Sequence, residues 1–181
     1  MTPKLEQKLI VKYPLILAKT QQTANEGDMY FGICCGDGWY NILDSLFWNI
    51  QTYITETNKN TVQDTYYNLM REHALVGDYK LFNQYYSGYD IYLLDTFREQ
   101  LLVSKPKPLV PKVQQIVATQ IKEKLGSLRF YYDGFGNERI MGMCYMAESL
   151  SSTTCEVCGN PGHVRTNNMS LRARCDAHVN Q

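Results

Sequence analysis

The chain has 181 residues and a mass of 20.9 kDa, which suits one compact domain or a main domain with a small satellite. Hydrophobic residues make up 44%, which is enough for a core and excludes a disordered tail. Eighteen Lys and Arg balance eighteen Asp and Glu, and this zero net charge argues against a protein that coats nucleic acid by bulk electrostatics. No apolar run approaches the roughly 20 residues that span a bilayer, so we expect no membrane segment.

The N-terminal segment alternates charged and apolar residues, which is not typical of a signal peptide. Residues 3–12 predict a short helix, with Thr2 as its N-cap and Pro3 at the first helical position. A polar loop is expected over residues 20–29. Residues 30–37 then indicate a short buried stretch that ends in a turn.

A second helix is expected from Trp39 onward, because apolar residues recur at a spacing of three and four. The residues of this face are Ile42, Leu43, Leu46, Phe47, Ile50, Tyr53 and Ile54. Asn58, Lys59 and Asn60 predict its end. The distinctive CGDGWY segment (35–40) precedes it. We interpret this segment as a turn that delivers Trp39 into the core; a catalytic role for Asp37 is the alternative.

Residues 61–104 are aromatic and acidic, with six acidic and three basic residues and seven of the fourteen tyrosines. Helices are predicted near 61–75 and 89–102, with a loop between them. Tyrosine is enriched at protein interfaces, so the segment suits a partner-binding surface, and packing within a helical subdomain is the alternative. The candidate partner-binding residues are Tyr79, Tyr85, Tyr86, Tyr89 and Tyr92.

Three prolines in residues 105–112 (KPKPLVPK) forbid a helix and indicate an extended linker. Residues 113–122 and 127–132 then predict a β-hairpin with Gly126 at the end of its turn. A helix is predicted over 137–150, with Asn137 as its candidate N-cap.

The strongest chemical signal lies at the C-terminus, where two ligand pairs, Cys155-x-x-Cys158 and Cys175-x-x-His178, are separated by sixteen residues. Zinc prefers four such ligands in a tetrahedron. Residues 163–165 and 171–174 can pair as a hairpin, which returns the second ligand pair to the first. We predict a zinc-ribbon or treble-clef-like knob, in which His163 is the rival fourth ligand.

Four protein ligands would close the zinc shell and leave no position for water, so a structural zinc ion is expected. Cys34 and Cys35 are interpreted as residues buried beside the helix that begins at Trp39, with a second metal or redox pair as the alternative, and Cys144 is interpreted as a core residue. No secretion signal is visible, and the spacing of the last three cysteines favours a metal site over a disulfide framework. We therefore expect a cytoplasmic protein with reduced thiols.

Residues 103–131 hold six basic residues and one acidic residue, which raises nucleic-acid binding as the second hypothesis. Its candidate residues are Lys122, Lys124, Arg129, Arg165, Arg172 and Arg174. Solvated surface charge is the alternative interpretation. A nucleotide-acting enzyme that uses Asp37 and Arg129 is the third hypothesis, and the lack of a nucleophile–base set or paired carboxylates disfavours it.

The segments CGDGWYNIL (35–43), ATQIKEKLGSLRFYYDG (118–134) and AESLSSTTCEVCGNPG (147–162), followed by CDAH (175–178), resemble a group of small uncharacterised bacteriophage and prophage proteins. The tyrosine-rich stretch is not part of that pattern. The resemblance implies a phage accessory protein with a zinc knob, acting in the cytoplasm of the host bacterium. It implies no catalytic residues.

Together these observations predict an α+β protein of four parts. A helical part (1–60) and a tyrosine-rich helical insertion (61–104) pack on a linker, hairpin and helix (105–150), followed by the zinc knob (151–181). The leading functional hypothesis is a non-enzymatic protein that binds and modulates a host protein, such as a component of bacterial defence. Self-association through the tyrosines is an alternative use of the same surface.

Overall fold

The computed structural model describes residues 1–19, 32–167 and 170–180. Its contacts divide the chain into two compact units, one formed by Met1–Ile54 with Val113–Gln181 and the other by Thr55–Lys112. The tyrosine-rich segment lies within the second unit. The polar loop expected over 20–29 lies outside the described residues.

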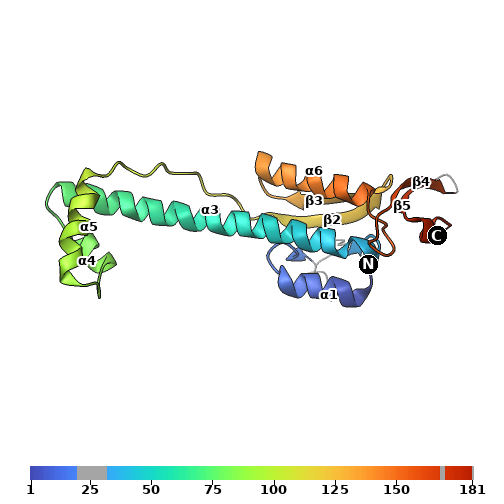
Figure 1. Cartoon of the computed structure of the whole chain (residues 1–181), viewed down its shortest axis with the longest axis horizontal. Coiled ribbons are helices and arrows are strands. Elements are labelled where there is room, and N and C mark those ends of the chain that lie inside the picture. Colours follow the sequence, from blue (N-terminus) through green and yellow to red (C-terminus); the bar gives the residue numbers. More distant parts are fainter. Residues whose placement is uncertain (20–31, 168–169, 181) are drawn as a thin grey trace. The chain divides into compact units, whose positions relative to one another are not determined.

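The first unit is α+β, as predicted, and its elements are labelled in Figure 1. In chain order they are α1 (Pro3–Lys12), β1 (Ile33–Cys34), the 3-10 turn η1 (Asp37–Trp39), the first part of α3 (Tyr40–Leu75), β2 (Val117–Lys124), β3 (Ser127–Asp133), α6 (Glu138–Ser152), β4 (His163–Asn167), β5 (Ser170–Arg174) and the 3-10 turn η2 (Asp176–His178). Helix α1 has the predicted bounds, with Pro3 in its first turn.

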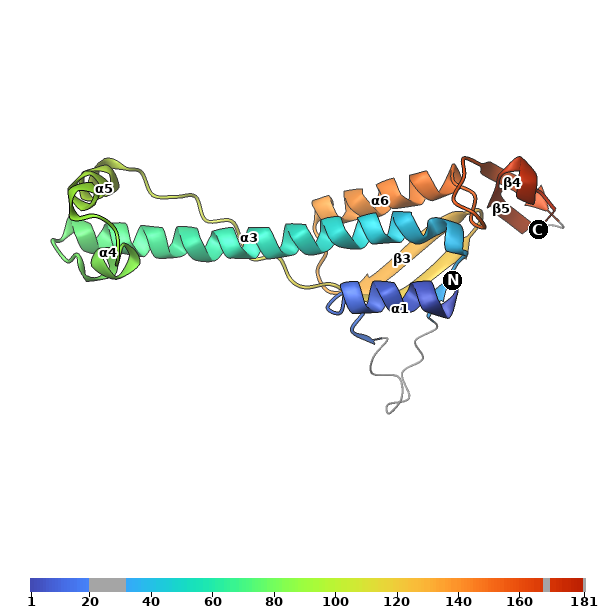
Figure 2. The same ribbon diagram turned by 60° about the horizontal axis from the view of Figure 1, so that its bottom comes forward.

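A mixed three-stranded sheet of order β1-β2-β3 forms the centre of this unit. Strand β1 is parallel to β2, and β2 is antiparallel to β3. Both ribbon views place the first part of α3 between α6 and α1 (Figures 1 and 2), and the three helices share one core with the sheet. The predicted β2–β3 hairpin is confirmed, although β2 is shifted toward the C-terminus relative to 113–122. Leu125 and Gly126 form its two-residue turn with φ of 55° and 80°, and a type I′ turn requires positive φ at both positions.

The predicted apolar face of α3 forms the core of the first unit. Leu43, Phe47 and Ile50 are fully buried there, and Trp39 is buried at the start of the helix. Helix α6 begins as expected, because the side chain of Asn137 accepts a hydrogen bond from the N–H of Ile140 at 3.2 Å.

The predicted end of this helix at Asn58–Asn60 is wrong, because α3 runs without interruption to Leu75 and includes the separate helix predicted over 61–75. Asparagine lowers helix stability by well under about 1 kcal/mol relative to alanine, and neither proline nor glycine interrupts this stretch. Thr61 and Thr65 also bond the carbonyls four residues earlier, at 2.9 and 2.7 Å, which keeps their hydroxyls satisfied within the helix.

The second unit packs α4 (Lys80–Tyr85) and α5 (Ile91–Val103) against its part of α3. Helix α5 matches the predicted 89–102 closely, whereas α4 forms where a loop was expected. The cause is Phe82, which is fully buried at the centre of this unit's core and holds the short helix in place. The linker is extended, as predicted, and the side chain of Asn68 bonds both backbone groups of Lys107 at 2.7 and 2.9 Å.

Candidate metal centre

The four predicted ligands, Cys155, Cys158, Cys175 and His178, come together at the C-terminal end of the first unit. The first pair lies on a tight turn that is closed by a bond from the N–H of Gly159 to the carbonyl of Cys155 at 2.8 Å. Gly159 has a φ of 78°, the left-handed conformation that glycine adopts without strain.

The β4–β5 hairpin returns the second ligand pair to the first, with His163 opposite Arg174. Turn η2 then places His178 beside Cys175, and the N–H of His178 bonds the carbonyl of Cys175 at 3.1 Å. The predicted pairing of 163–165 with 171–174 and the helical turn after Cys175 are both confirmed. His163 is exposed in β4 and does not belong to the cluster.

The ligand atoms all lie within 4.8 Å of one another. The Sγ atoms of Cys158 and Cys175 are 3.8 Å apart, and Nδ1 of His178 lies 3.6 Å from Sγ of Cys155 and 3.3 Å from Sγ of Cys175. A tetrahedral zinc ion with bonds of about 2.3 Å to sulfur and about 2.0–2.1 Å to nitrogen would separate its ligands by about 3.8 and 3.6 Å. The cluster therefore has the dimensions of a tetrahedral metal site and can hold a metal ion.

The peptide groups around the first cysteine favour a thiolate. Burial raises the pKa of the Cys155 thiol, but hydrogen bonds from the backbone N–H groups of Cys175, Cys158 and Val157 outweigh burial and lower this pKa to about 6. Metals bind thiolate rather than thiol, so the turn prepares one ligand for coordination.

The GDGW turn is the surface against which this cluster packs. The N–H of Gly38 bonds the carbonyl of Glu156 at 2.8 Å, and Nε1 of Trp39 bonds the carbonyl of Thr154 at 2.9 Å. A Cβ on Gly36 would lie 2.1 Å from the Glu156 carbonyl oxygen, and one on Gly38 would lie 2.2 Å from the Cys155 carbonyl oxygen. Both glycines are therefore needed for backbone to approach backbone at this contact.

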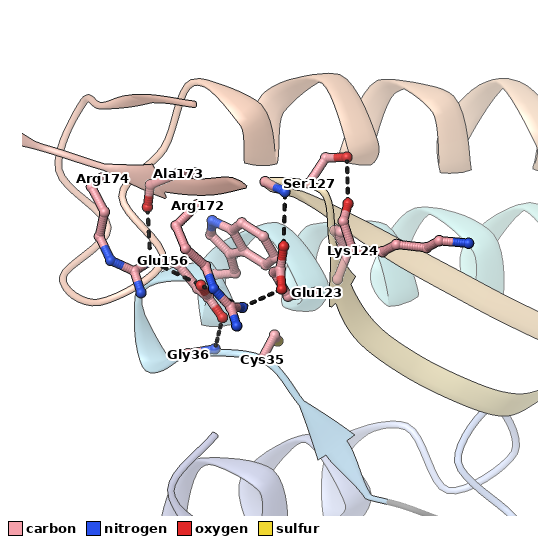
Figure 3. Close-up of polar contacts among 12 residues, drawn as sticks. Cys35, Gly36, Glu123, Lys124, Ser127, Glu156, Arg172, Ala173 and Arg174 are labelled. Atoms are coloured by element: carbon pink, nitrogen blue, oxygen red, sulfur yellow. Dashed lines mark hydrogen bonds and ion pairs between the residues drawn. The ribbon is translucent and has the colours of Figure 1, made fainter. Parts of the chain in front are cut away.

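The buried carboxylate of Glu156 joins the loop of Cys155 and Cys158 to the GDGW turn and to strand β5 (Figure 3). Its Oε1 accepts from the N–H of Gly36 at 2.9 Å and its Oε2 from Nη1 of Arg174 at 2.9 Å, while Arg172 lies 4.0 Å away. Both Glu156 and Arg174 are more than nine-tenths buried. The sequence analysis missed this residue; its position between two ligand cysteines, with two arginines in the facing strand, was the available signal.

The turn of the β2–β3 hairpin contacts the β4–β5 hairpin, which connects the two ligand pairs. Glu123 accepts from the N–H of Gly126 at 2.8 Å and forms an ion pair with Arg172 (Figure 3). A Cβ on Gly126 would lie 2.6 Å from Cγ1 of Val164 in β4. The CGDGW segment thus packs against the loop that carries Cys155 and Cys158, and the KEKLG segment packs against the β4–β5 hairpin.

The remaining cysteines separate into two environments, and none of the six forms a disulfide. Burial raises the pKa of Cys35 to about 12 and that of Cys144 to about 11, which agrees with their expected core positions. Cys34 is exposed, so its predicted burial is wrong. The reason is the alternation of an extended chain, because Ile33 of β1 and Cys35, which follows the strand, are buried while Cys34 between them points outward.

All four arginines considered for nucleic-acid binding have carboxylate partners. Arg174 pairs with Glu156 and Arg172 with Glu123. The other pairs are Arg129 with Glu148 at 2.6 Å and Arg165 with Asp176. Of the two lysines, Lys122 lies 5.5 Å from the ring centre of Tyr131, and Lys124 is exposed in β2.

Asp37 has a structural contact, since its Oδ1 accepts from the N–H of Thr2 at 2.6 Å. Its enzymatic partner in the third hypothesis, Arg129, is bonded instead to Glu148 and to the hydroxyl of Ser127. The interpretation of CGDGWY as a turn that delivers Trp39 into the core agrees with these contacts.

The predicted partner-binding tyrosines all belong to the second unit, where two of them contact Phe82. Tyr79 and Tyr86 pack against the core of this unit and contribute to its stability. Tyr85, Tyr89 and Tyr92 are 55%, 56% and 85% exposed and are open to a partner.

A comparison of the chain with protein-family models, curated proteins and solved structures finds no match. In the part of the chain that the structure describes, no helix is long and apolar enough to cross a membrane.

Proposed function

We propose that the protein is a non-enzymatic binding protein of a bacteriophage, in which a structural zinc ion holds the C-terminal knob and the exposed tyrosines contact a protein of the bacterial host. The donor set supports zinc, because three thiolates and one imidazole can supply the four ligands of a closed tetrahedral shell, as in structural zinc sites. Such a site supplies folding energy to a small module.

A protein partner is favoured over nucleic acid because the candidate arginines already bond carboxylates. These arginines are Arg129, Arg165, Arg172 and Arg174. A carboxylate that already bonds a guanidinium offsets its charge and occupies part of its N–H donors, which weakens the attraction of that guanidinium for a phosphate. The tyrosines of α4 and α5, by contrast, expose ring area of the kind that is enriched at protein interfaces.

Affinity purification from bacterial lysate, with and without nuclease, tests this proposal when it is followed by mass spectrometry of protein and nucleic acid. A discrete partner that survives nuclease and is lost when Tyr85, Tyr89 and Tyr92 are replaced by serine is the expected result. Val62→Ser is a matched control, because Val62 is exposed on α3 of the same unit. Recovery that disappears with nuclease would contradict the proposal and favour nucleic-acid binding through Lys122 and Lys124.

A further inference from the structure

The first part of α3 and helix α6 are the two walls of a groove of about 260 Å³ in the first unit. Its apolar lining ranges from the buried Leu46 to Met146 and Leu150, which are 58% and 51% exposed. None of the described residues that line this groove carries a charge. The α3–α6 groove is therefore an apolar hollow that opens to the protein surface.

The α3 wall of this groove also carries a row of polar side chains. Asn41, Ser45 and Asn49 follow one another at a spacing of four, and all three are exposed. Nδ2 of Asn49 donates to the carbonyl of Ser45 at 2.7 Å, which leaves Oδ1 of the same amide as an acceptor. Apolar contact area with acceptors along one side suits a flat ring that carries a single N–H donor.

Trp48 presents such a ring on the same face of α3. It follows Asn41 by seven positions and Ser45 by three, a spacing that places these side chains on one side of the helix. The side chain of Trp48 is 59% exposed and does not line the groove of its own chain. Indole is apolar except for one N–H, which usually finds an acceptor when it is buried. Tryptophan is also among the residues that contribute most binding energy at protein interfaces.

The ring and the groove are complementary in size and in placement. A cavity of about 150 Å³ holds a benzene molecule, so a groove of about 260 Å³ has room for the larger indole. In a dimer with two-fold symmetry, both copies use the same surface patch. A patch that carries both a projecting ring and a hollow for that ring is therefore complementary to itself.

From these observations we propose that two copies of the chain associate through the α3–α6 groove, with the Trp48 ring of each copy seated in the groove of the other. The indole contacts Met146 and Leu150, and its N–H donates to the row of Asn41, Ser45 and Asn49. This inference goes beyond the proposed function, because it concerns a surface of the first unit, whereas the exposed tyrosines belong to the second.

Sedimentation velocity of the full zinc-loaded chain, over a hundredfold range of concentration, tests the association. We expect the mass to rise with concentration from 20.9 kDa to twice that value. Tryptophan emission should move to shorter wavelength over the same range, because Trp39 is already buried and Trp48 leaves water only in the dimer. A chain that stays monomeric throughout would overturn the proposal and leave the groove to a partner of another sequence.

Two variants remove the two halves of the contact. Trp48→Ser removes the ring, and Met146→Lys places a charge in the groove at an exposed helical position. Each is expected to weaken self-association at least tenfold. Val11→Ser is the control, because Val11 is a 71% exposed apolar residue on α1 of the same unit and should leave association unchanged. Unchanged association of Trp48→Ser would refute the role of the ring.

Mixing the two variants tests the reciprocal geometry. The Met146→Lys chain retains its ring and the Trp48→Ser chain retains its groove, so one of the two contacts can form between them. We expect the mixture to associate more tightly than either variant alone. A mixture that associates no more than the separate variants would contradict the insertion of each ring into the opposite groove.

The tyrosines of the second unit provide the competing route to self-association. A chain in which Tyr85, Tyr89 and Tyr92 are replaced by serine is expected to associate as the wild type does. Association that is lost in this variant and kept in Trp48→Ser would overturn the proposal. The outcome does not depend on the lysate experiment, so failure to recover a host protein would contradict the proposed function and leave the groove contact in place.

Discussion

The carbonyl oxygen of Cys155 occupies the space where a side chain on Gly38 would begin, since a Cβ there would lie 2.2 Å from it. Gly38→Ala therefore forces two backbone segments apart and should lower the free energy of unfolding by about 3 kcal/mol or more. Chemical denaturation measures this loss. Gly142→Ala is the matched control, because its Cβ meets nothing within 4 Å inside α6 and should stabilise by about 0.5–1 kcal/mol. Equal stabilities of the two variants would contradict the packing described.

Replacement of a ligand should release the metal. Cys155→Ser and Cys175→Ser each remove one thiolate from the cluster, whereas Cys35→Ser alters a cysteine outside it. We expect one zinc per chain in the wild type and in Cys35→Ser, and much less in the two ligand variants, as measured by inductively coupled plasma mass spectrometry. Equal zinc loss in all three variants would show that the ligand set is wrong.

Removal of the metal should be visible at Trp39, because this buried indole bonds the carbonyl of Thr154 just before the first ligand. Trp48, the second tryptophan, is 59% exposed and would mask the signal, so Trp48→Phe supplies the background. A strong chelator is expected to shift the fluorescence of this variant to longer wavelength. Unchanged emission after complete zinc removal would mean that the GDGW turn holds Trp39 without the metal.

Glu156→Gln should cost far more than a change at an exposed ion pair. It leaves the buried guanidinium of Arg174 without its carboxylate, which should cost about 3–5 kcal/mol. Glu148→Gln breaks the more exposed pair with Arg129 and should cost less than about 1 kcal/mol. Thermal denaturation of both variants provides the comparison, and similar shifts in Tm would refute the role given to Glu156.

Thiol alkylation should distinguish the cysteines by environment. With metal bound, only Cys34 is expected to react rapidly, because burial of Cys35 and partial burial of Cys144 raise the pKa of these thiols to about 12 and about 11. After chelation, Cys155, Cys158 and Cys175 should react as well. Mass spectrometry of the alkylated peptides checks the order, and early labelling of Cys35 would contradict its burial.

The sequence by itself determined the features that depend on local spacing. The ligand pairs at Cys155 and Cys175, the hairpin between them and the cap at Asn137 each follow from a few neighbouring residues. The α+β class was predicted for the same reason, since helical and strand periodicities are local. The end of α3 was mispredicted because Asn58–Asn60 disfavour a helix only weakly, and the burial of Phe82 in α4 had no signal in its polar neighbours.

Only the tertiary structure decided which distant groups face one another. The contact of Gly36 and Gly38 with the metal-binding loop joins residues more than one hundred positions apart, as does the bond from Gly36 to Glu156. The partners of the arginines were equally hidden, because an ion pair depends on position in space and not on sequence distance. Burial and pairing of charge arise only when the chain is folded, and they place Arg172 and Arg174 of β5 against Glu123 and Glu156 beside the cysteine cluster.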